Sequence, residues 1–480
     1  MKARDLFEGL PITRAPYGAE SAEIARVVTS AKEATANTLY VACKTAVTNG
    51  RFEMETAYAC GCRAFLCPFD ADPGEGALVW NATEPERLLG TLAARSHGYP
   101  ARRMTVLGIT GSTGKSSVAL QTVRVLRECG RRVSVLCSDG LDLLGVRTYP
   151  GAVVPDAACV QDALAQMASA GSEIAVLELS SYQLSHFAAQ EIPFTAVLLT
   201  NLSERHVGNG EHESFAAYRE AKYSLLRKPS AFCVLPAGEA TQTDARVVRV
   251  GAGGDLWAEN VRTELFTGEM PHTRLTLCEK KRKTEIITPV VGDIAVQTVL
   301  YTAALCRIAG LSSAQIAKGF AAAPVAGRME CLSAENERLI YLDNAFLPQD
   351  LSCALQTLRS LTDGRLCVLL GSVGGRARAR RAALARVAER FADRVYLTAD
   401  DSDTEDPENI CLEMQRSMQE PLRADVIPDR HVAILRAVRE MRPRDTLLLL
   451  AKPYPAGQLV CGKYLPFDER EVVARALAKF

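Results

Sequence analysis

Glycines and hydroxyl residues surround a lysine in residues 108–117, which read GITGSTGKSS directly after an apolar run. A strand that ends in a glycine-rich turn and enters a helix presents backbone N–H groups to phosphate oxygens. Lys115 would reach the β- and γ-phosphates of a nucleotide, and the Ser116 hydroxyl would bind Mg²⁺. The residues expected to line this nucleotide site are Thr110, Gly111, Ser112, Thr113, Gly114, Lys115, Ser116 and Ser117.

A carboxylate ends a second apolar run, because residues 176–181 read VLELSS. A glutamate on an apolar strand is costly to bury without a partner. An acid at the end of a strand can hold Mg²⁺ directly or through water. We therefore predict that Glu178 is a metal ligand near the phosphate loop, the alternative being a strand end that emerges into solvent.

Three further residues are ambiguous when each is taken alone. His206, in the stretch TNLSERH, could be a metal ligand or an ordinary loop histidine. Lys222, in the amphipathic stretch FAAYREAKYSLL, has the pattern of a solvated helical charge. Arg328, in AGRME, could reach a nucleotide phosphate from a domain junction or be an exposed hinge charge.

Strands alternate with helices through most of the chain, which predicts an α/β fold of βαβ units with mainly parallel sheets. We expect three domains: a small α/β N-terminal domain (1–100), a central ATP-binding domain with a mostly parallel sheet (101–328) and a Rossmann-like doubly wound C-terminal domain (329–480). Residues 263–289 alternate like an added antiparallel hairpin. Expected strands are 38–43, 64–67, 104–109, 133–137, 174–179, 195–199, 339–343, 366–370, 394–398 and 446–450; expected helices are 53–60, 116–129, 157–169, 350–361, 382–392, 408–418 and 431–441.

The composition is that of a globular enzyme, with 480 residues, 48% hydrophobic and 23% charged. Basic and acidic residues balance at 56 each, so no net field favours nucleic acid or an anionic membrane. The N-terminus lacks the apolar segment of a secretory signal. Fifteen scattered cysteines indicate reduced thiols. We expect a cytoplasmic monomer without a nucleic-acid partner or membrane insertion.

Taken in order, the motifs TGSTGKS, LELSS, TNLSERH, YREAK, AGRME and LDNAFLP resemble those of the Mur ligases. The chain is most similar to the MurE branch, which adds the third peptide residue to UDP-N-acetylmuramoyl-L-Ala-D-Glu. The resemblance covers nearly the whole chain. It implies that ATP phosphorylates a substrate carboxylate, and that an amine then attacks the mixed anhydride to form an amide.

The resemblance also implies roles for the charged residues. Lys115 would stabilise the moving phosphoryl group, while Ser116 and Glu178 would hold one Mg²⁺. His206 would help to hold a second Mg²⁺, together with a carbamate formed when CO₂ adds to Lys222. An unperturbed lysine has a pKa of about 10.4, so this modification requires an environment that favours the neutral amine.

Arg328, at the junction with the C-terminal domain, and Asp343, within that domain, would bind the nucleotide, and domain closure would assemble the site. The positions that correspond to the UDP-substrate and amino-acid sites of the branch are Ser30, Val153, Val154, Ser180, Arg376, Asp400, Asp401 and Asp403.

The chain departs from the pattern of the branch at several positions. Arg205 stands where an aspartate usually precedes the motif histidine, and Phe346 stands in place of a histidine. Ala295 and Thr298 replace two asparagines that commonly meet the adenine. These changes predict a looser or different adenine contact.

The amino-acid pocket differs most, because the Asp-Asn-Pro-Arg motif associated with meso-diaminopimelate reads Asp400-Asp401-Ser402-Asp403. An arginine at the last position grips a distal carboxylate, whereas an aspartate repels it and attracts an ammonium group. We therefore expect a cationic diamino acid such as L-lysine.

Two alternatives remain open from the sequence. One is a Mur-family ligase for another acid, of the folate or poly-amino-acid type, which the lost uracil-site residues motivate. The other is a nucleotide-binding regulator that has lost turnover, for which the missing adenine amides and Pro455 argue. The loop spacing disfavours a plain P-loop kinase.

Overall fold

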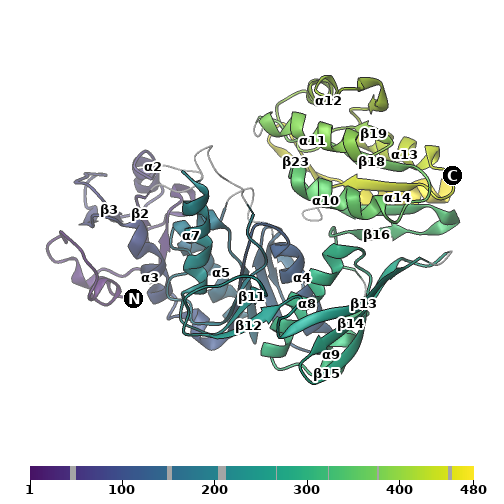
Figure 1. Cartoon of the computed structure of the whole chain (residues 1–480). Helices are drawn as coiled ribbons and strands as arrows, with labels where there is room; N and C mark the ends of the chain where they lie inside the picture. The colour runs from purple at the N-terminus through teal and green to yellow at the C-terminus, as the bar shows by residue number, and fades with distance from the viewer. Residues whose placement is uncertain are drawn as a thin grey trace. The chain divides into compact units, whose positions relative to one another are not determined.

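A computed structural model describes residues 1–43, 50–148, 154–203, 212–265, 268–322, 324–375, 378–451 and 457–479. The chain forms two compact units (Figure 1). The first comprises Met1–Val250 with Ala304–Gly310, and the second comprises Gly251–Ala303 with Leu311–Phe480. The boundaries predicted at residues 100 and 328 stay predictions. No helix within the described ranges is both long enough and apolar enough to span a membrane.

The first unit begins with a four-stranded parallel sheet in the order β1-β2-β3-β4. Strands β2 and β3 are buried along their whole length, as expected for a parallel sheet covered on both faces. The two strands and the helix predicted here are confirmed to within two residues. The elements are β1 Arg26–Val28, β2 Thr38–Val41, β3 Ala64–Cys67, β4 Leu78–Asn81, α1 Ala3–Phe7, α2 Met54–Ala59 and α3 Glu86–Ser96.

The larger sheet of the first unit has the strand order β12-β11-β10-β5-β9-β6-β7-β8. Its strands are parallel from β12 to β6, and β7 and β8 extend it as an antiparallel edge. The strands are β5 Thr105–Thr110, β6 Val133–Cys137, β7 Gly140–Leu143, β8 Val146–Thr148, β9 Ile174–Glu178, β10 Phe194–Leu199, β11 Ser230–Pro236 and β12 Arg246–Val250. The helices are α4 Lys115–Glu128, α5 Ala157–Ser169, α6 Ser181–Ser185 and α7 Phe215–Leu226.

The apolar pattern of the sequence explains this sheet. In the central strand β5, every residue from Val106 to Thr110 is buried. Helix α4 buries Val118, Val125 and Leu126, which lie on one face at helical spacing. Because β5, β9 and β10 are parallel neighbours, the residues that follow their carboxyl ends meet at one edge of the sheet.

The second unit begins with three antiparallel strands, β13, β14 and β15. The predicted hairpin corresponds to β14 and β15, and β13 adds a third strand. Helix α8 contains the boundary between Ala303 and Ala304. The elements are β13 Leu256–Glu264, β14 His272–Glu279, β15 Arg282–Thr288, α8 Asp293–Ile308 and α9 Ser313–Phe320.

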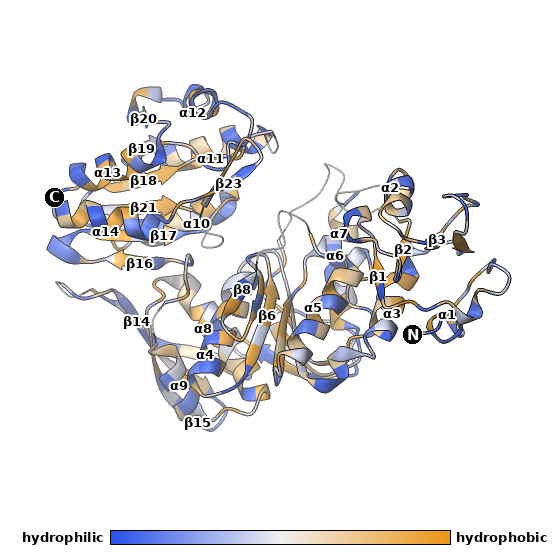
Figure 2. Cartoon of the chain, turned by 180° about the vertical axis from the view of Figure 1, so that it is seen from behind, coloured by the Kyte–Doolittle hydropathy of each residue, from blue (hydrophilic) through white to orange (hydrophobic). Residues whose placement is uncertain are grey.

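The rest of the second unit contains a separate antiparallel hairpin, β22 and β23, and a six-stranded sheet in the order β16-β17-β21-β18-β19-β20, in which only β16 is antiparallel. The sheet is doubly wound: Val368 and Leu370 share a core with α10, α11 and α12, whereas Leu369 and Leu449 share one with α13 and α14. Figure 2 shows β18 and β21 as hydrophobic between helices with polar outer faces. The strands are β16 Glu330–Ser333, β17 Leu339–Asp343, β18 Leu366–Leu370, β19 Arg394–Leu397, β20 Ala424–Val426, β21 Thr446–Leu450, β22 Gly457–Val460 and β23 Lys463–Pro466; the helices are α10 Pro348–Arg359, α11 Arg378–Phe391, α12 Pro407–Arg416, α13 Arg430–Glu440 and α14 Glu469–Lys479.

Candidate active site

The phosphate loop connects β5 to α4 through two glycines with positive φ, Gly111 at 148° and Gly114 at 76°. A Cβ on Gly111 would lie 1.9 Å from the Thr200 hydroxyl, so no side chain fits there. Gly114 is the N-cap of α4, and Lys115 and Ser116 follow it in the first helical turn. The strand–turn–helix predicted for the nucleotide site is therefore present.

The loop is braced by the residues that follow the neighbouring strand β10. The Thr200 hydroxyl donates to the Thr113 carbonyl at 2.6 Å. The Asn201 carboxamide accepts from the Thr113 amide at 3.1 Å and donates to the Thr113 hydroxyl at 2.8 Å. On the other side, the buried Thr110 hydroxyl donates to the Leu179 carbonyl at 2.8 Å. These contacts hold the loop in shape from both neighbouring strands.

Ser116 and Glu178 meet, as the sequence predicts. The Ser116 Oγ donates to Glu178 Oε2 at 2.8 Å, and the Ser138 amide donates to the same oxygen at 3.1 Å. Glu178 is only 9% exposed, so the alternative of a strand end emerging into solvent is wrong. A carboxylate and hydroxyls converge here, and oxygens of this kind are the ligands that Mg²⁺ prefers. Across the described ranges, no three His, Cys, Asp or Glu side chains gather into a metal site of their own.

Lys222 lies against the phosphate loop. Its side chain is 2% exposed, and its Nζ donates to the Gly111 carbonyl at 2.7 Å. The Nζ also lies 4.6 Å from the ring centre of Tyr218, whose hydroxyl is 2.8 Å from the Ser112 hydroxyl. The reading of Lys222 as a solvated helical charge is therefore wrong: α7 delivers a buried amine to the loop.

In the second unit, Arg328 and Asp343 lie close together where β17 ends. Asp343 Oδ2 accepts from the Met329 amide at 2.7 Å, and Met329 has a φ of 47°. With its carboxamide oxygen turned toward the guanidinium, Asn344 accepts from Arg328 at 3.1 and 3.3 Å. Burial raises the pKa of Asp343 to about 6, opposed by Arg328 and the Met329 amide. The two predicted nucleotide contacts thus form one polar cluster.

The aspartates of the predicted amino-acid pocket hold a hairpin in place. Asp401 is buried and accepts from the Leu459 amide at 2.9 Å. Asp403 Oδ1 accepts from the Gly462 amide at 2.7 Å. Asp400 lies in the same loop after β19. These acids therefore lie together at the carboxyl edge of the sheet, and two of them have a structural contact that the sequence did not predict.

Two of the remaining predicted substrate residues of the first unit, Ser180 and Val154, lie close to Gln183. Ser180 caps α6 by accepting from the Gln183 amide at 3.1 Å, so its hydroxyl has a structural partner. The Gln183 side chain also donates to the Pro155 carbonyl, next to the exposed Val154. Ser30 precedes a short 3-10 turn, Ala31–Glu33. His206, Val153 and Arg376 lie outside the described residues.

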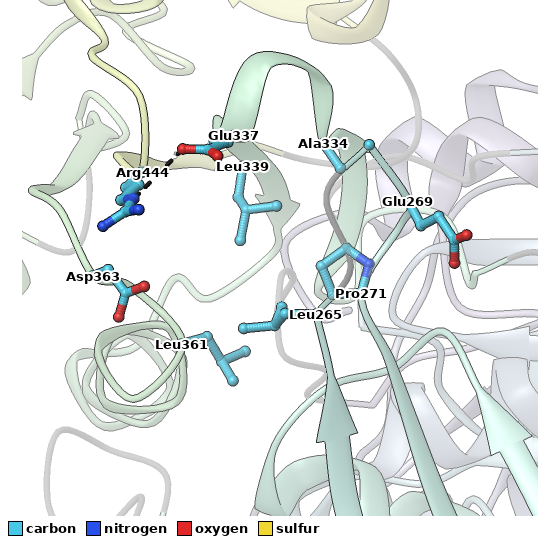
Figure 3. Close-up of a pocket in the computed structure, with 10 residues that line it drawn as sticks. Leu265, Glu269, Pro271, Ala334, Glu337, Leu339, Leu361, Asp363 and Arg444 are labelled. Carbon is cyan, nitrogen blue, oxygen red and sulfur yellow. Dashed lines mark hydrogen bonds and ion pairs between the residues drawn. The ribbon is translucent and has the colours of Figure 1, made fainter.

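A separate cavity of about 270 Å³ lies in the second unit. Figure 3 shows Leu265, Leu339 and Leu361 among its lining residues, together with Arg444, which is paired to Glu337. None of the predicted site residues lines it.

The sequence assigned no role to Ser138, Thr200, Asn201 or Tyr218, although signals for them existed. Ser138 directly follows the predicted strand 133–137, and Thr200 and Asn201 directly follow 195–199. Polar residues just after parallel strands belong to the ligand edge of such a sheet. Tyr218 precedes Lys222 by one helical turn, so its contact with that lysine follows from helix spacing.

Two family models match the chain. Residues 109–306 match the Mur ligase middle domain, and residues 327–452 match the Mur ligase, glutamate ligase domain. The UDP-N-acetylmuramoyl-L-alanyl-D-glutamate–2,6-diaminopimelate ligase of Geobacillus kaustophilus is 28% identical over 501 residues, covering 100% of this chain and 99% of that protein. The ligase of the same name from Alkalilimnicola ehrlichii is 31% identical over 407 residues, covering 82% of this chain and 80% of that protein.

Solved structures agree with the fold. A structure of UDP-N-acetylmuramoyl-L-alanyl-D-glutamate–2,6-diaminopimelate ligase aligns with a TM-score of 0.67 at 20% identity, covering 100% of this chain and 99% of that one. Folylpolyglutamate synthase of Mycobacterium tuberculosis aligns with a TM-score of 0.59 at 19% identity, covering 75% and 91%. At these identities the likeness concerns the fold, and it confirms the predicted α/β class.

Proposed function

The chain belongs to the Mur ligase family, and from this premise we propose that it joins a cationic diamino acid, such as L-lysine, to UDP-N-acetylmuramoyl-L-Ala-D-Glu. It is an ATP-dependent acid–amino-acid ligase of the MurE type that uses Mg²⁺ and acts on small molecules in peptidoglycan synthesis. The amino acid and the acyl substrate are each tested directly below.

The reaction has two steps, a phosphoryl transfer followed by an acyl transfer. A carboxylate oxygen of the substrate attacks the γ-phosphorus of ATP, and ADP leaves. The amine of the incoming amino acid then attacks the acyl carbon, loses a proton, and inorganic phosphate leaves as the amide forms. The protein has to position these groups and neutralise charge. In this proposal Lys115 and the loop amides hold the transferred phosphoryl group.

Mg²⁺ neutralises phosphate charge when it is bound. Ser116 and Glu178 would hold it, which agrees with their 2.8 Å contact and with the burial of Glu178. His206 is our candidate for helping to hold a second ion.

Lys222 is the proposed site of a carbamate. In this proposal CO₂ adds to the neutral amine, and the nitrogen loses a proton. The carbamate nitrogen keeps one N–H, which can still donate to the Gly111 carbonyl, the partner of Nζ at 2.7 Å. Burial of the side chain keeps water away from the modified group. The carbamate would place a negative charge beside the phosphate loop.

The preference for a cationic side chain is based on Asp400, Asp401 and Asp403. Asp403 uses Oδ1 to accept from the Gly462 amide, and its charge would attract an ammonium group and repel a distal carboxylate. The curated relatives are named for 2,6-diaminopimelate, so the proposal predicts a difference in specificity between this chain and those relatives.

The observation that carries the proposal is the convergence of Ser116, Glu178 and Lys222 on the phosphate loop. The test is phosphate release by the purified full chain with ATP, Mg²⁺ and UDP-N-acetylmuramoyl-L-Ala-D-Glu. We expect release to depend on L-lysine or L-ornithine and to be abolished by Lys115→Ala. A clear preference for meso-diaminopimelate would contradict the proposed amino acid.

The choice of acyl substrate has its own test. The UDP-muramoyl dipeptide should raise the midpoint of thermal unfolding, whereas folates should not. Protection by a folate without protection by the dipeptide would favour the alternative ligase for another acid.

A further inference from the structure

Two loops at the carboxyl edge of the C-terminal sheet contact each other through their backbones. Residues 371–375 follow β18, and residues 398–406 follow β19. A Cβ on Gly371 would lie 2.5 Å from the Thr398 carbonyl oxygen, and one on Gly374 would lie 1.9 Å from that of Ser402. The Gly374 amide donates to the Asp401 carbonyl at 2.7 Å. Contacts this close couple the position of one loop to that of the other.

Arg381, on α11, binds both loops with one buried guanidinium. Its side chain is 1% exposed, and Nη1 and Nη2 donate to the two Glu405 oxygens at 2.8 and 2.6 Å. Nη2 also donates to the Val373 carbonyl at 3.1 Å, and Nη1 to Glu413 on α12 at 2.6 Å. A planar fork can hold a carboxylate at two points in a fixed orientation, which a lysine cannot do.

Glu405 also connects the two loops directly. Its Oε2 accepts from the Gly375 amide of the first loop at 3.0 Å, while its own backbone belongs to the second loop. The Arg381 guanidinium and this amide lower the pKa of Glu405 to about 2, so Glu405 is ionised at neutral pH.

We propose that Arg381 is a positioning residue for the incoming amino acid: it fixes the loop that carries Asp400, Asp401 and Asp403 against the loop 371–375. This inference rests on the proposed function, which assigns those aspartates to the amino-acid pocket. Arg381 itself is buried and acts only through Glu405 and the two loops. Its loss should therefore weaken amino-acid binding more than nucleotide binding.

Arg365 offers a control at the amino-terminal end of β18, the strand whose carboxyl end leads into the loop 371–375. It lies just before β18 and donates to Asp445 Oδ2 through Nε at 3.1 Å and Nη2 at 2.6 Å. Asp445 is 2% exposed. Arg365→Met and Arg381→Met each remove an arginine–carboxylate ion pair made by two N–H groups, but only Arg381 contacts the two loops.

The test compares Arg381→Met, Arg381→Lys and Arg365→Met in the full chain by phosphate release. Arg381→Met should raise the KM for L-lysine by about tenfold or more, and change the KM for ATP by less than about threefold. Arg381→Lys should recover part of the loss, and Arg365→Met should leave both KM values within about threefold. An equal rise of both KM values, or an equal effect of the two methionine variants, would overturn the inference.

Two further measurements apply if Arg381→Met does not fold or if the wild type releases no phosphate. If Arg381→Met does not fold, Glu405→Gln is expected to give the same selective rise in the KM for L-lysine. If the wild type releases no phosphate with any amino acid, the ligase proposal fails, but amide hydrogen exchange still tests positioning. Residues 371–375 and 398–406 should exchange faster in Arg381→Met than in Arg365→Met, and unchanged exchange would refute the role.

Discussion

Lys222 Nζ donates to the Gly111 carbonyl oxygen at 2.7 Å, which joins the middle of helix α7 to the first glycine of the phosphate loop. The contact is buried and is flanked by the Tyr218 ring. A change at Lys222 therefore acts directly on the loop that we assign to the nucleotide.

Lys222→Gln should lower phosphate release by roughly 100-fold or more, because it removes the carbamate that, in this proposal, helps to hold a second Mg²⁺ against the phosphates. Lys228→Gln is the control, since Lys228 lies just beyond the end of α7, and it should retain activity. Isotopically labelled bicarbonate should give a carbamate NMR signal in the wild type but not in the variant. A signal present in both proteins would place the carbamate on another residue.

Glu178→Gln should raise the Mg²⁺ concentration needed for half-maximal activity by about tenfold or more, since one charged oxygen ligand becomes neutral. The amide keeps an acceptor for Ser116 and the Ser138 amide, so the fold should be preserved. A titration with MgCl₂ at fixed ATP measures the change. Ser185→Ala, on the exposed face of α6, should leave the Mg²⁺ requirement unaltered, and an unaltered requirement in Glu178→Gln would exclude this carboxylate as a ligand.

The two loop glycines should respond differently to alanine. Gly114→Ala meets no atom within 4 Å and suffers only the strain of a positive φ, about 1 kcal/mol. Gly111→Ala would also place its Cβ 1.9 Å from the Thr200 hydroxyl, so the loop has to shift. We expect a larger fall in thermal midpoint, and a larger loss of stabilisation by ATP, for Gly111→Ala. The reverse order would show that the loop is not packed as described.

Asp343 predicts a pH dependence of stability in the absence of nucleotide. Burial raises its folded pKa from 3.8 to about 6, with Asp350 acting in the same direction and Arg328 and the Met329 amide acting against it. The folded state therefore holds this proton more tightly than the unfolded state. Its contribution is full below about pH 4 and is lost as the pH rises through 6, by at most about 3 kcal/mol. Asp343→Asn should flatten the stability profile between pH 4 and 6 in urea unfolding; a slope equal to that of the wild type would contradict the assignment.

Asp403→Asn separates the structural hydrogen bond of this residue from its proposed attraction for an ammonium group. The amide oxygen can still accept from the Gly462 amide, the partner of Oδ1 at 2.7 Å, but the charge is gone. The KM for L-lysine should rise by about tenfold, which corresponds to the loss of about 1.4 kcal/mol of attraction, while thermal stability stays near that of the wild type. A fall in stability without a change in KM would make Asp403 a purely structural residue.

Much of the site could be predicted from the positions of polar residues at the ends of the expected strands. Glu178 ends one parallel strand and Ser116 follows the adjacent one, so their contact was predictable from the alternation of strands and helices. The edge strands β7 and β8 were not predicted. They are only four and three residues long, and they are joined by tight turns, whereas the sequence pattern indicated strands joined by helices.

Side-chain contacts between residues far apart in the sequence were harder to predict. Nothing in the spacing of residues 215–226 indicates that Lys222 turns inward; the family resemblance, and not periodicity, assigned it a role. Arg381 lies among several arginines of one helix, a pattern typical of a solvated face, and its burial depends on Glu405 and Glu413 arriving from other elements. Ser180 was assigned to the substrate, but its hydroxyl caps α6.

The enclosure of Lys222 sets a size limit on its chemistry. With 2% of the residue exposed, bulky acylating labels should reach its amine only slowly, whereas CO₂, a molecule of three atoms, needs only a small transient opening beside its contacts with Tyr218 and Gly111. Surface lysines should therefore be consumed by amine-reactive probes long before this one, and the order in which lysines are labelled would report how often that opening occurs.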